Sequence, residues 1–139
     1  MSLALFLTGL AVVAVFVAIV RLAPHDAARW HVGPFTAEDP GEGGVRIVRR
    51  LEGDPETVLA RLDAVALAEP RTERLAGSPA EGRITWVTRT RGVGFPDYTT
   101  VAARKNGDGC ELAVLARLRF GKSDLGVNRE RVERWLEGL

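Results

Sequence analysis

The N-terminal end of the chain is a long apolar run. Positions 2–20 carry no charged side chain, and the first charge is that of Arg21. As an α-helix, this run would rise about 28 Å at ~1.5 Å per residue, which is close to the ~30 Å hydrocarbon core of a bilayer. We therefore predict a transmembrane helix over residues 1–22, a connecting segment over 23–44 and a single domain over 45–139.

Two other interpretations of the apolar run stay open. A cleaved signal peptide has a basic start, a shorter apolar core and a cleavage site between small residues, whereas this run lacks a preceding Lys or Arg and ends at Val20 and Arg21. A buried helix of a soluble protein is rarely so uniformly apolar. We favour a retained single-pass anchor in a bacterial inner membrane. Arg21 and Arg29 favour a cytoplasmic domain by the positive-inside rule, but two arginines leave the side open.

The pattern after residue 44 predicts a strand followed by a helix. Residues 45–51 read as a strand. Asp54 is a typical helix N-cap, and Pro55 suits the first helical position. An apolar stripe with helical spacing follows, and Pro70 disfavours the helical conformation in the residue before it. We therefore expect a helix over 55–68.

The next part of the chain predicts an antiparallel meander that ends in a hairpin. Asn-Gly and Asp-Gly both favour the positive φ angles of tight hairpin turns, and the two pairs follow each other at 106–109. Pairing Lys105 with Cys110 brings the apolar faces of the two flanking strands together and places Tyr98 opposite Arg117, where we expect a cation–π contact. The expected strands cover residues 71–76, 83–91, 97–105 and 110–120.

The last element is a predicted helix over 129–138, with Asn128 as its N-cap. The resulting order of elements is β-α-β-β-β-β-α. It predicts an α+β fold with an antiparallel sheet of about five strands and two helices on one face. This order resembles the helix-grip fold in a reduced form, and one transmembrane helix precedes it.

Composition narrows the function. The net charge is +1, with 19 basic and 18 acidic side chains, which argues against a general nucleic-acid binder. A single cysteine, Cys110, excludes an intramolecular disulfide and a cysteine-based zinc site. The two histidines, His25 and His31, have no ligand partners at metal spacing apart from Asp26. We therefore expect no cofactor, no metal and no nucleic-acid partner.

Two segments are the most distinctive in the chain: Gly-Phe-Pro-Asp at 94–97, and Arg-Leu-Arg-Phe-Gly-Lys-Ser-Asp-Leu-Gly-Val-Asn-Arg-Glu-Arg at 117–131. Together they resemble the bacterial and plastid family called domain of unknown function 1499. Two features depart from its pattern: Leu118 replaces a serine, and an N-terminal pair of cysteines is absent. The resemblance implies an α+β, envelope-associated domain with no assigned reaction. The matching positions are Gly94, Phe95, Asp97, Arg119, Gly121, Ser123, Asp124, Gly126, Asn128, Arg129 and Arg131.

The 117–131 segment allows two interpretations. In one, basic and polar side chains around a helix N-terminus bind an anion or a phosphate or carboxylate head group. In the other, the polar residues satisfy one another at a strand-to-helix corner, with Arg119 held by Asp97 or Asp124. The candidate ligand-binding residues are Arg119, Lys122, Ser123, Asn128 and Arg131, and the candidate structural residues are Phe95, Asp97, Gly121, Asp124, Gly126 and Arg129.

Three functional hypotheses follow. The leading one is a membrane-anchored, non-catalytic binding or structural module of the cell envelope, whose partner is an amphipathic or anionic small molecule or an envelope protein. The second is a small membrane-bound, hydrolase-like enzyme that uses Asp97 and Asp124, although the surrounding arginines predict lowered pKa values for both carboxyls. The third is a domain that only binds other proteins. No nucleophile and base pattern supports catalysis.

Overall fold

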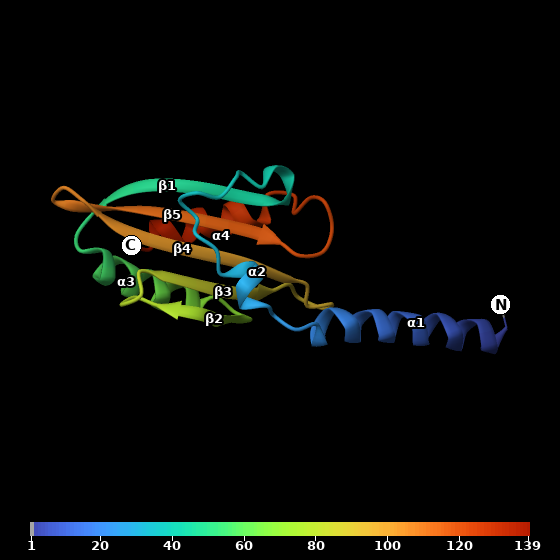
Figure 1. Ribbon diagram of the computed structural model, residues 1–139. Coiled ribbons are helices and arrows are strands. Elements are labelled where there is room, and N and C mark those ends of the chain that lie inside the picture. The colour runs from blue at the N-terminus through green and yellow to red at the C-terminus, as the bar shows by residue number, and fades with distance from the viewer. Residues whose placement is uncertain (1) are drawn as a thin grey trace.

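One long apolar helix and one antiparallel sheet dominate the computed structural model, which describes residues 2–139. Helix α1 (Leu3–Leu22) projects from one end of the domain (Figure 1), and Val20 is its one buried residue. The hydroxyl of Ser2 accepts a hydrogen bond from the backbone N–H of Leu5 and caps the helix. The remaining elements are α2 (Ala27–Trp30), the 3₁₀ turn η1 (Gly41–Gly43), β1 (Gly44–Glu52), α3 (Pro55–Ala68), β2 (Thr72–Ser78), β3 (Arg83–Arg89), β4 (Pro96–Asn106), β5 (Gly109–Leu118) and α4 (Val127–Glu137).

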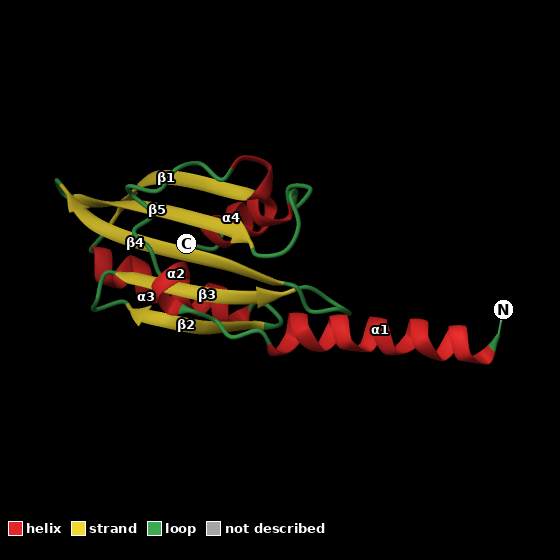
Figure 2. Cartoon of the chain, turned by 45° about the vertical axis from the view of Figure 1, so that its right-hand side comes forward, coloured by secondary structure: helices red, strands yellow, loops and turns green. Residues whose placement is uncertain are grey.

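The sheet contains five strands in the order β1-β5-β4-β3-β2, and every neighbouring pair is antiparallel. Helices α3 and α4 lie on the same face of the sheet (Figure 2). The α+β fold predicted from the sequence is therefore confirmed. The hairpin register is also confirmed, because Lys105 pairs with Cys110 and Val101 pairs with Val114. A slip by one residue would turn one apolar face towards solvent, which is why the pattern specified this register.

Helix α3 forms as its sequence predicts. The Asp54 carboxylate accepts hydrogen bonds from the backbone N–H groups of Glu56 and Thr57, and Pro55 occupies the first helical position. The helix ends at Ala68, because the residue before Pro70 adopts an extended conformation. The predicted bounds of 55–68 are correct.

The main core fills the space between the sheet and the two helices. Trp86 of β3 and Trp135 of α4 meet edge to face with their ring centroids 5.6 Å apart. The indole N–H of Trp86 donates to the carboxylate of Asp63 on α3 at 2.9 Å, and Arg74 pairs with the same carboxylate. The fully buried hydrophobic residues of this core include Leu59, Leu62, Ile84, Trp86, Val101 and Leu112.

The connecting segment covers part of the other face of the sheet. The indole of Trp30 stacks on the ring of Tyr98 with centroids 3.9 Å apart and an interplanar angle of 5°. Arg117 lies opposite Tyr98 as predicted, but its guanidinium sits over Trp30, 4.9 Å from the ring centroid. The predicted contact between Arg117 and Tyr98 is therefore wrong, because Trp30 occupies the exposed face of the tyrosine ring.

Two predicted strands are longer than the observed ones. β3 ends at Arg89 and not at position 91, and β5 ends at Leu118 and not at Phe120. After β3, Thr90 closes a loop: its backbone N–H donates to the carbonyl of Phe95, and its hydroxyl accepts from the backbone N–H of Phe95. Both boundaries fall at the end of the domain next to α1.

Two adjacent glycines at the start of β1 test the packing of this edge strand. A Cβ atom at Gly44 would overlap the carbonyl oxygen of Ala116 on β5, whereas a Cβ atom at Gly43 would have its nearest neighbour at 3.7 Å. We expect Gly44→Ala to lower the free energy of unfolding by about 1–3 kcal/mol through overpacking. Gly43→Ala should change it by less than about 0.5 kcal/mol. Denaturant unfolding followed by tryptophan fluorescence measures both, and equal effects of the two substitutions would contradict this packing.

Candidate functional site

The two distinctive sequence segments meet at one corner of the domain. Residues 117–131 run from the end of β5 to the start of α4, and residues 94–97 lead into β4, which pairs with β5. This corner lies at the end of the sheet from which α1 projects (Figure 1). Residues far apart in the sequence therefore form a single cluster near the apolar helix.

A buried ion pair connects β4 to α4 at this corner. The guanidinium of Arg131 donates to the carboxylate of Asp97 at 3.4 Å and to the side-chain oxygen of Asn128 at 2.9 Å. Asp97 is 6% exposed, Arg131 is 5% exposed and Asn128 is fully buried. Removing one partner of such a pair leaves a buried charge without compensation, which typically costs about 3–5 kcal/mol. The cluster therefore fixes the position of α4 on the sheet.

The N-terminus of α4 is held by Asp124 and not by Asn128. The helix begins at Val127, and the Asp124 carboxylate accepts hydrogen bonds from the backbone N–H groups of Gly126 at 2.9 Å and Asn128 at 3.0 Å. Leu125 and Gly126 adopt positive φ angles of 53° and 80°, which turn the chain into the helix. The predicted N-cap at Asn128 is wrong, because this turn places Asn128 inside the first helical turn with its side chain in the core.

The pKa values of the two carboxyl groups at this corner are shifted in opposite directions. Burial raises the pKa of Asp97, and the charge of Asp124 adds to that effect, whereas the charge and hydrogen bond of Arg131 only partly oppose it. Burial also acts to raise the pKa of Asp124, but hydrogen bonds from Asn128 and from the backbone outweigh it, and the pKa is lowered. The sequence predicted lowered values for both, so the prediction is wrong for Asp97. Neighbouring arginines were visible in the sequence, and burial was not.

A clasp of hydrogen bonds and aromatic contacts joins the domain to α1. The guanidinium of Arg21 donates to the carbonyls of Gly92 and Val93, and the guanidinium of Arg89 donates to the carbonyls of Val20, Arg21 and Gly94. The ring of Phe95 lies between two others, with its centroid 6.1 Å from that of Phe16 on α1 and 6.2 Å from that of Phe120. We call the contacts of residues 89–95 with the last turns of α1 the helix clasp.

The structure separates the five candidate ligand-binding residues. Asn128 and Arg131 come together in the buried cluster. Arg119 lies on the other face of the sheet, where its guanidinium donates to the carbonyl of Pro24 at 2.8 Å and to the hydroxyl of Tyr98 at 3.0 Å. Lys122 and Ser123 are exposed in the loop before α4. Ligand binding by these residues stays a prediction.

The candidate structural residues divide in the same way. Neither Asp97 nor Asp124 holds Arg119, so the predicted pairing is wrong: the guanidinium of Arg119, one residue beyond the end of β5, is taken up by the carbonyl of Pro24 and the hydroxyl of Tyr98. Gly121 has a φ angle of 100°, which favours glycine. Arg129 is exposed on the first turn of α4.

His25 and Arg89 form a part of this region that sequence reasoning missed. The guanidinium of Arg89 can only donate, so the contact of 3.1 Å with Nε2 makes this histidine nitrogen an acceptor. Nδ1 of His25 therefore carries the proton and donates to the hydroxyl of Tyr98 at 2.7 Å. Burial lowers the pKa of His25, and the charges of Arg89 and Arg119 lower it further. No sequence signal marks these contacts, because they join residues more than 60 positions apart.

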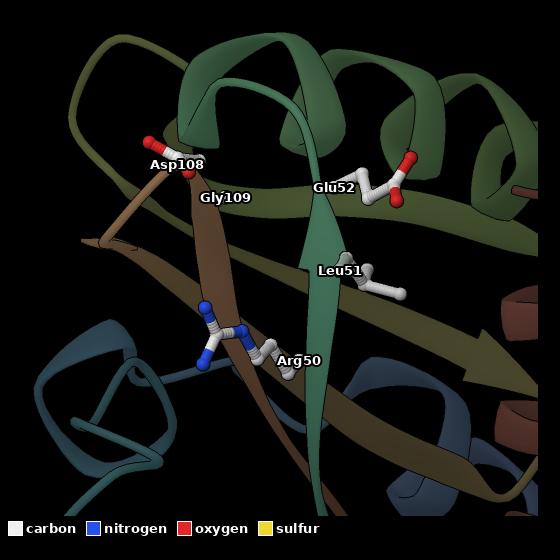
Figure 3. A pocket seen from close by; sticks show the side chains of 5 residues that line it. All are labelled: Arg50, Leu51, Glu52, Asp108 and Gly109. Atoms are coloured by element: carbon white, nitrogen blue, oxygen red, sulfur yellow. The ribbon is translucent and has the colours of Figure 1, made fainter.

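A hollow at the opposite end of the domain shows no comparable organisation. It has a volume of about 510 Å³ and lies beside the hairpin turn and the end of β1. Figure 3 shows that its charged side chains, Arg50, Glu52 and Asp108, point in different directions and do not converge. Among residues 2–139, no group of three or more His, Cys, Asp or Glu side chains is placed to hold a metal ion.

The fold and this corner define the class of the protein: a single-sheet α+β domain attached to an apolar N-terminal helix. Over residues 35–139 the chain matches the family described as "Protein of unknown function (DUF1499)". The chain belongs to this family, which confirms the resemblance seen in its sequence.

Solved structures also resemble this chain. The crystal structure of protein MLL2253 from Mesorhizobium loti is 14% identical, with a TM-score of 0.47, and the match covers 67% of this chain and 96% of that chain. No curated protein matches the chain.

The opposite pKa shifts of Asp97 and Asp124 predict opposite effects of pH on two variants. Asp97 binds its proton more tightly in the folded state, so the stability of the protein relative to Asp97→Asn should fall as the pH rises above about 4. Asp124 binds its proton less tightly when folded, so the stability relative to Asp124→Asn should fall as the pH drops below about 4. Denaturant unfolding between pH 3 and pH 7 measures both slopes. Slopes of the same sign would contradict the assigned environments.

Proposed function

We propose that this protein is a membrane-anchored, non-catalytic binding or structural module of the cell envelope, seated on the surface of a bacterial inner membrane. Helix α1 is long and apolar enough to cross a bilayer. Its one hydroxyl within the span, on Thr8, donates to the carbonyl of Ala4 at 2.9 Å, so it needs no partner in lipid. Large exposed side chains such as Leu5, Phe6 and Val12 cover its surface.

The contacts of α1 favour a retained anchor over the two alternatives. A core helix of a soluble protein would bury most of its side chains, and α1 buries only Val20. Cleavage of a signal peptide after residue 22 would remove Phe16 from Phe95 and would remove the carbonyls of Val20 and Arg21 from Arg89. These specific contacts between the domain and the end of α1 favour a mature protein that retains the helix.

The helix clasp is the observation that carries the proposal. It fixes the direction in which the domain faces, because the end of the sheet that holds residues 89–95 lies against the last turns of α1 (Figure 1). If α1 spans the bilayer, Phe95 and Phe120 lie at the membrane surface beside its last turns, where lipid can cover their apolar rings. The domain would then rest on the membrane and not hang from a flexible tether.

The loop before α4 offers a second contact with lipid. Leu125 is 92% exposed although its φ angle is 53°, and the neighbouring Val127 is 44% exposed. The loop reaches the same end of the domain as the helix clasp (Figures 1 and 2). Burying a leucine side chain in lipid contributes about 1.5–3 kcal/mol relative to its exposure in water. An exposed leucine at this position therefore favours insertion into the membrane surface.

The filled core favours a ligand at the surface over one enclosed in the domain. The space between the sheet and helices α3 and α4 is occupied by large buried side chains, among them Trp86, Leu59 and Trp135. An amphipathic molecule would need a cavity there. The carboxylates of Asp97 and Asp124 hold Arg131 and the first turn of α4, which favours positioning roles over acid and base chemistry. An anionic partner bound near the membrane fits the basic residues of this end best.

Extraction with alkaline carbonate tests the anchor. We expect the full chain of 15.1 kDa to remain in the membrane pellet, because a helix that spans the bilayer resists extraction, and to keep residues 2–22 on N-terminal sequencing. A soluble protein enclosed in the same membrane vesicles serves as the control, because carbonate should release it. A mature chain that begins near Ala23, or release of the protein by carbonate, would overturn the proposal.

A polarity-sensitive fluorophore at position 125 tests the seating of the domain. Leu125→Cys is labelled in the full chain, which is then reconstituted into liposomes. The fluorophore should emit at a shorter wavelength than the same fluorophore free in buffer, because the side chain enters the membrane interface. Asp108→Cys is the matched control, since Asp108 is exposed in the hairpin turn at the far end of the domain. The native Cys110 is buried and should react little. The same emission from both positions would show that the loop does not touch lipid.

A further inference from the structure

We propose that a pocket beside the helix clasp binds a phosphate group at the membrane surface. The pocket lies between the end of α3, the end of β3 and the first turns of α4, and its volume is about 310 Å³. The inference deepens the proposed function and rests on it, because it places this end of the domain at the level of the lipid head groups. We call the cavity the arginine pocket, after the five arginines that line it: Arg71, Arg89, Arg91, Arg131 and Arg134.

The arginine pocket carries an excess of positive charge. Two glutamates, Glu69 and Glu130, line it together with the five arginines. Arg134 pairs with Glu69 at 2.6 Å, and Arg131 pairs with the buried Asp97. Within residues 2–139, the other three arginines have no carboxylate within ion-pair distance. The two Nη groups of Arg89 already donate to the carbonyls of Val20, Arg21 and Gly94 and to Nε2 of His25, so Arg71 and Arg91 remain to meet an anion that enters the pocket.

Arg71 is held at the rim of the pocket by its own backbone conformation. Its φ angle is 59°, a left-handed conformation that a non-glycine residue adopts at a cost. Its carbonyl accepts a hydrogen bond from the backbone N–H of Arg89 at 2.9 Å, and its Nε donates to the carbonyl of Arg89 at 3.0 Å. These two bonds use the backbone and Nε, and they leave the two Nη groups of Arg71 to bind a ligand.

The chemistry of the arginine pocket favours a phosphate group. Guanidinium groups match the oxygen atoms of phosphate in a planar, bidentate geometry. Ligand pockets typically measure about 300–1,000 Å³, so this one is small and suits a head group better than a large molecule. Arg89 connects the pocket to α1. Its backbone carbonyl accepts a hydrogen bond from Nε of Arg71, and its guanidinium donates to the carbonyls of Val20 and Arg21. Lipid phosphates lie at this depth when α1 spans the bilayer.

The far end of the domain provides an internal comparison. The hollow of about 510 Å³ there is lined by one arginine, Arg50, and two acidic residues, Glu52 and Asp108. These side chains diverge (Figure 3) and leave no excess of positive charge. Arg50 and the nearby Lys105 are exposed, so their loss removes as much charge as the loss of two pocket arginines.

The experiment compares two double variants of the full chain in detergent micelles. Binding of short-chain phosphatidylglycerol, phosphatidylcholine and inorganic phosphate is measured by native mass spectrometry and by calorimetry. The wild type should bind phosphatidylglycerol more tightly than phosphatidylcholine. Arg71→Gln with Arg91→Gln should weaken this binding about 10-fold or more, because each lost charge-assisted hydrogen bond contributes to affinity. Arg50→Gln with Lys105→Gln should leave it within about 2-fold.

A single substitution at an exposed residue separates an effect on binding from an effect on folding. Arg91 is exposed, so Arg91→Gln leaves the core intact and should still weaken binding about 3-fold. Competition by millimolar inorganic phosphate would support the pocket and identify free phosphate as a ligand, whereas binding of phosphatidylglycerol without competition would identify the lipid. Equal losses in the two double variants, or no binding of phosphatidylglycerol and none of inorganic phosphate, would overturn the proposal. Release of the protein by carbonate with phosphate binding retained would refute the membrane function alone.

Discussion

The placement of α4 depends on one buried charge, the guanidinium of Arg131. It reaches the core only because Asp97 on β4 and Asn128 on α4 offer it oxygen atoms at 3.4 and 2.9 Å. Burial of a charged group is expensive unless such partners are present. Helix α4 can therefore pack on the sheet in one position, and the loop before it must deliver Asn128 to the interior. The Asp124 carboxylate accepts hydrogen bonds from the backbone N–H groups of Gly126 and Asn128, and the helix begins at Val127, two residues before the start that the sequence pattern indicates.

The same strand carries the link from this buried pair to the apolar helix. Phe95 lies in the loop immediately before β4, and Asp97 is the second residue of that strand. Asp97 meets Arg131 in the core, while Phe95 meets Phe16 of α1 and Phe120 beyond the end of β5. The short segment 94–97 thus couples the apolar helix α1 to the core.

The parts of the structure that could be predicted from the sequence are those governed by neighbouring residues. Asp54 and Pro55 define the start of α3, and the alternation on both sides of the 106–109 turn defines the hairpin register, because caps and pleats are local. The contacts that could not be predicted depend on tertiary packing. Arg117 lies over Trp30 only because the connecting segment crosses the sheet, and the pKa of Asp97 is raised only because the corner is buried. The helix clasp pairs Arg21 with residues more than 70 positions away, and no pattern within either segment indicates this contact.

The net charge of the chain does not describe how its charged side chains are distributed over the folded domain. A net charge of +1 describes a nearly neutral protein and correctly argues against a broad basic surface. The folded domain nevertheless distributes its charges unevenly along the axis of the sheet. Next to α1, Arg71, Arg89 and Arg91 gather without carboxylate partners, whereas the hollow at the other end combines one arginine, Arg50, with the acidic Glu52 and Asp108. Arginines without carboxylate partners beside an apolar helix form a surface that anionic lipids attract, because the same end of the domain then offers the lipid both an apolar helix and positive charge.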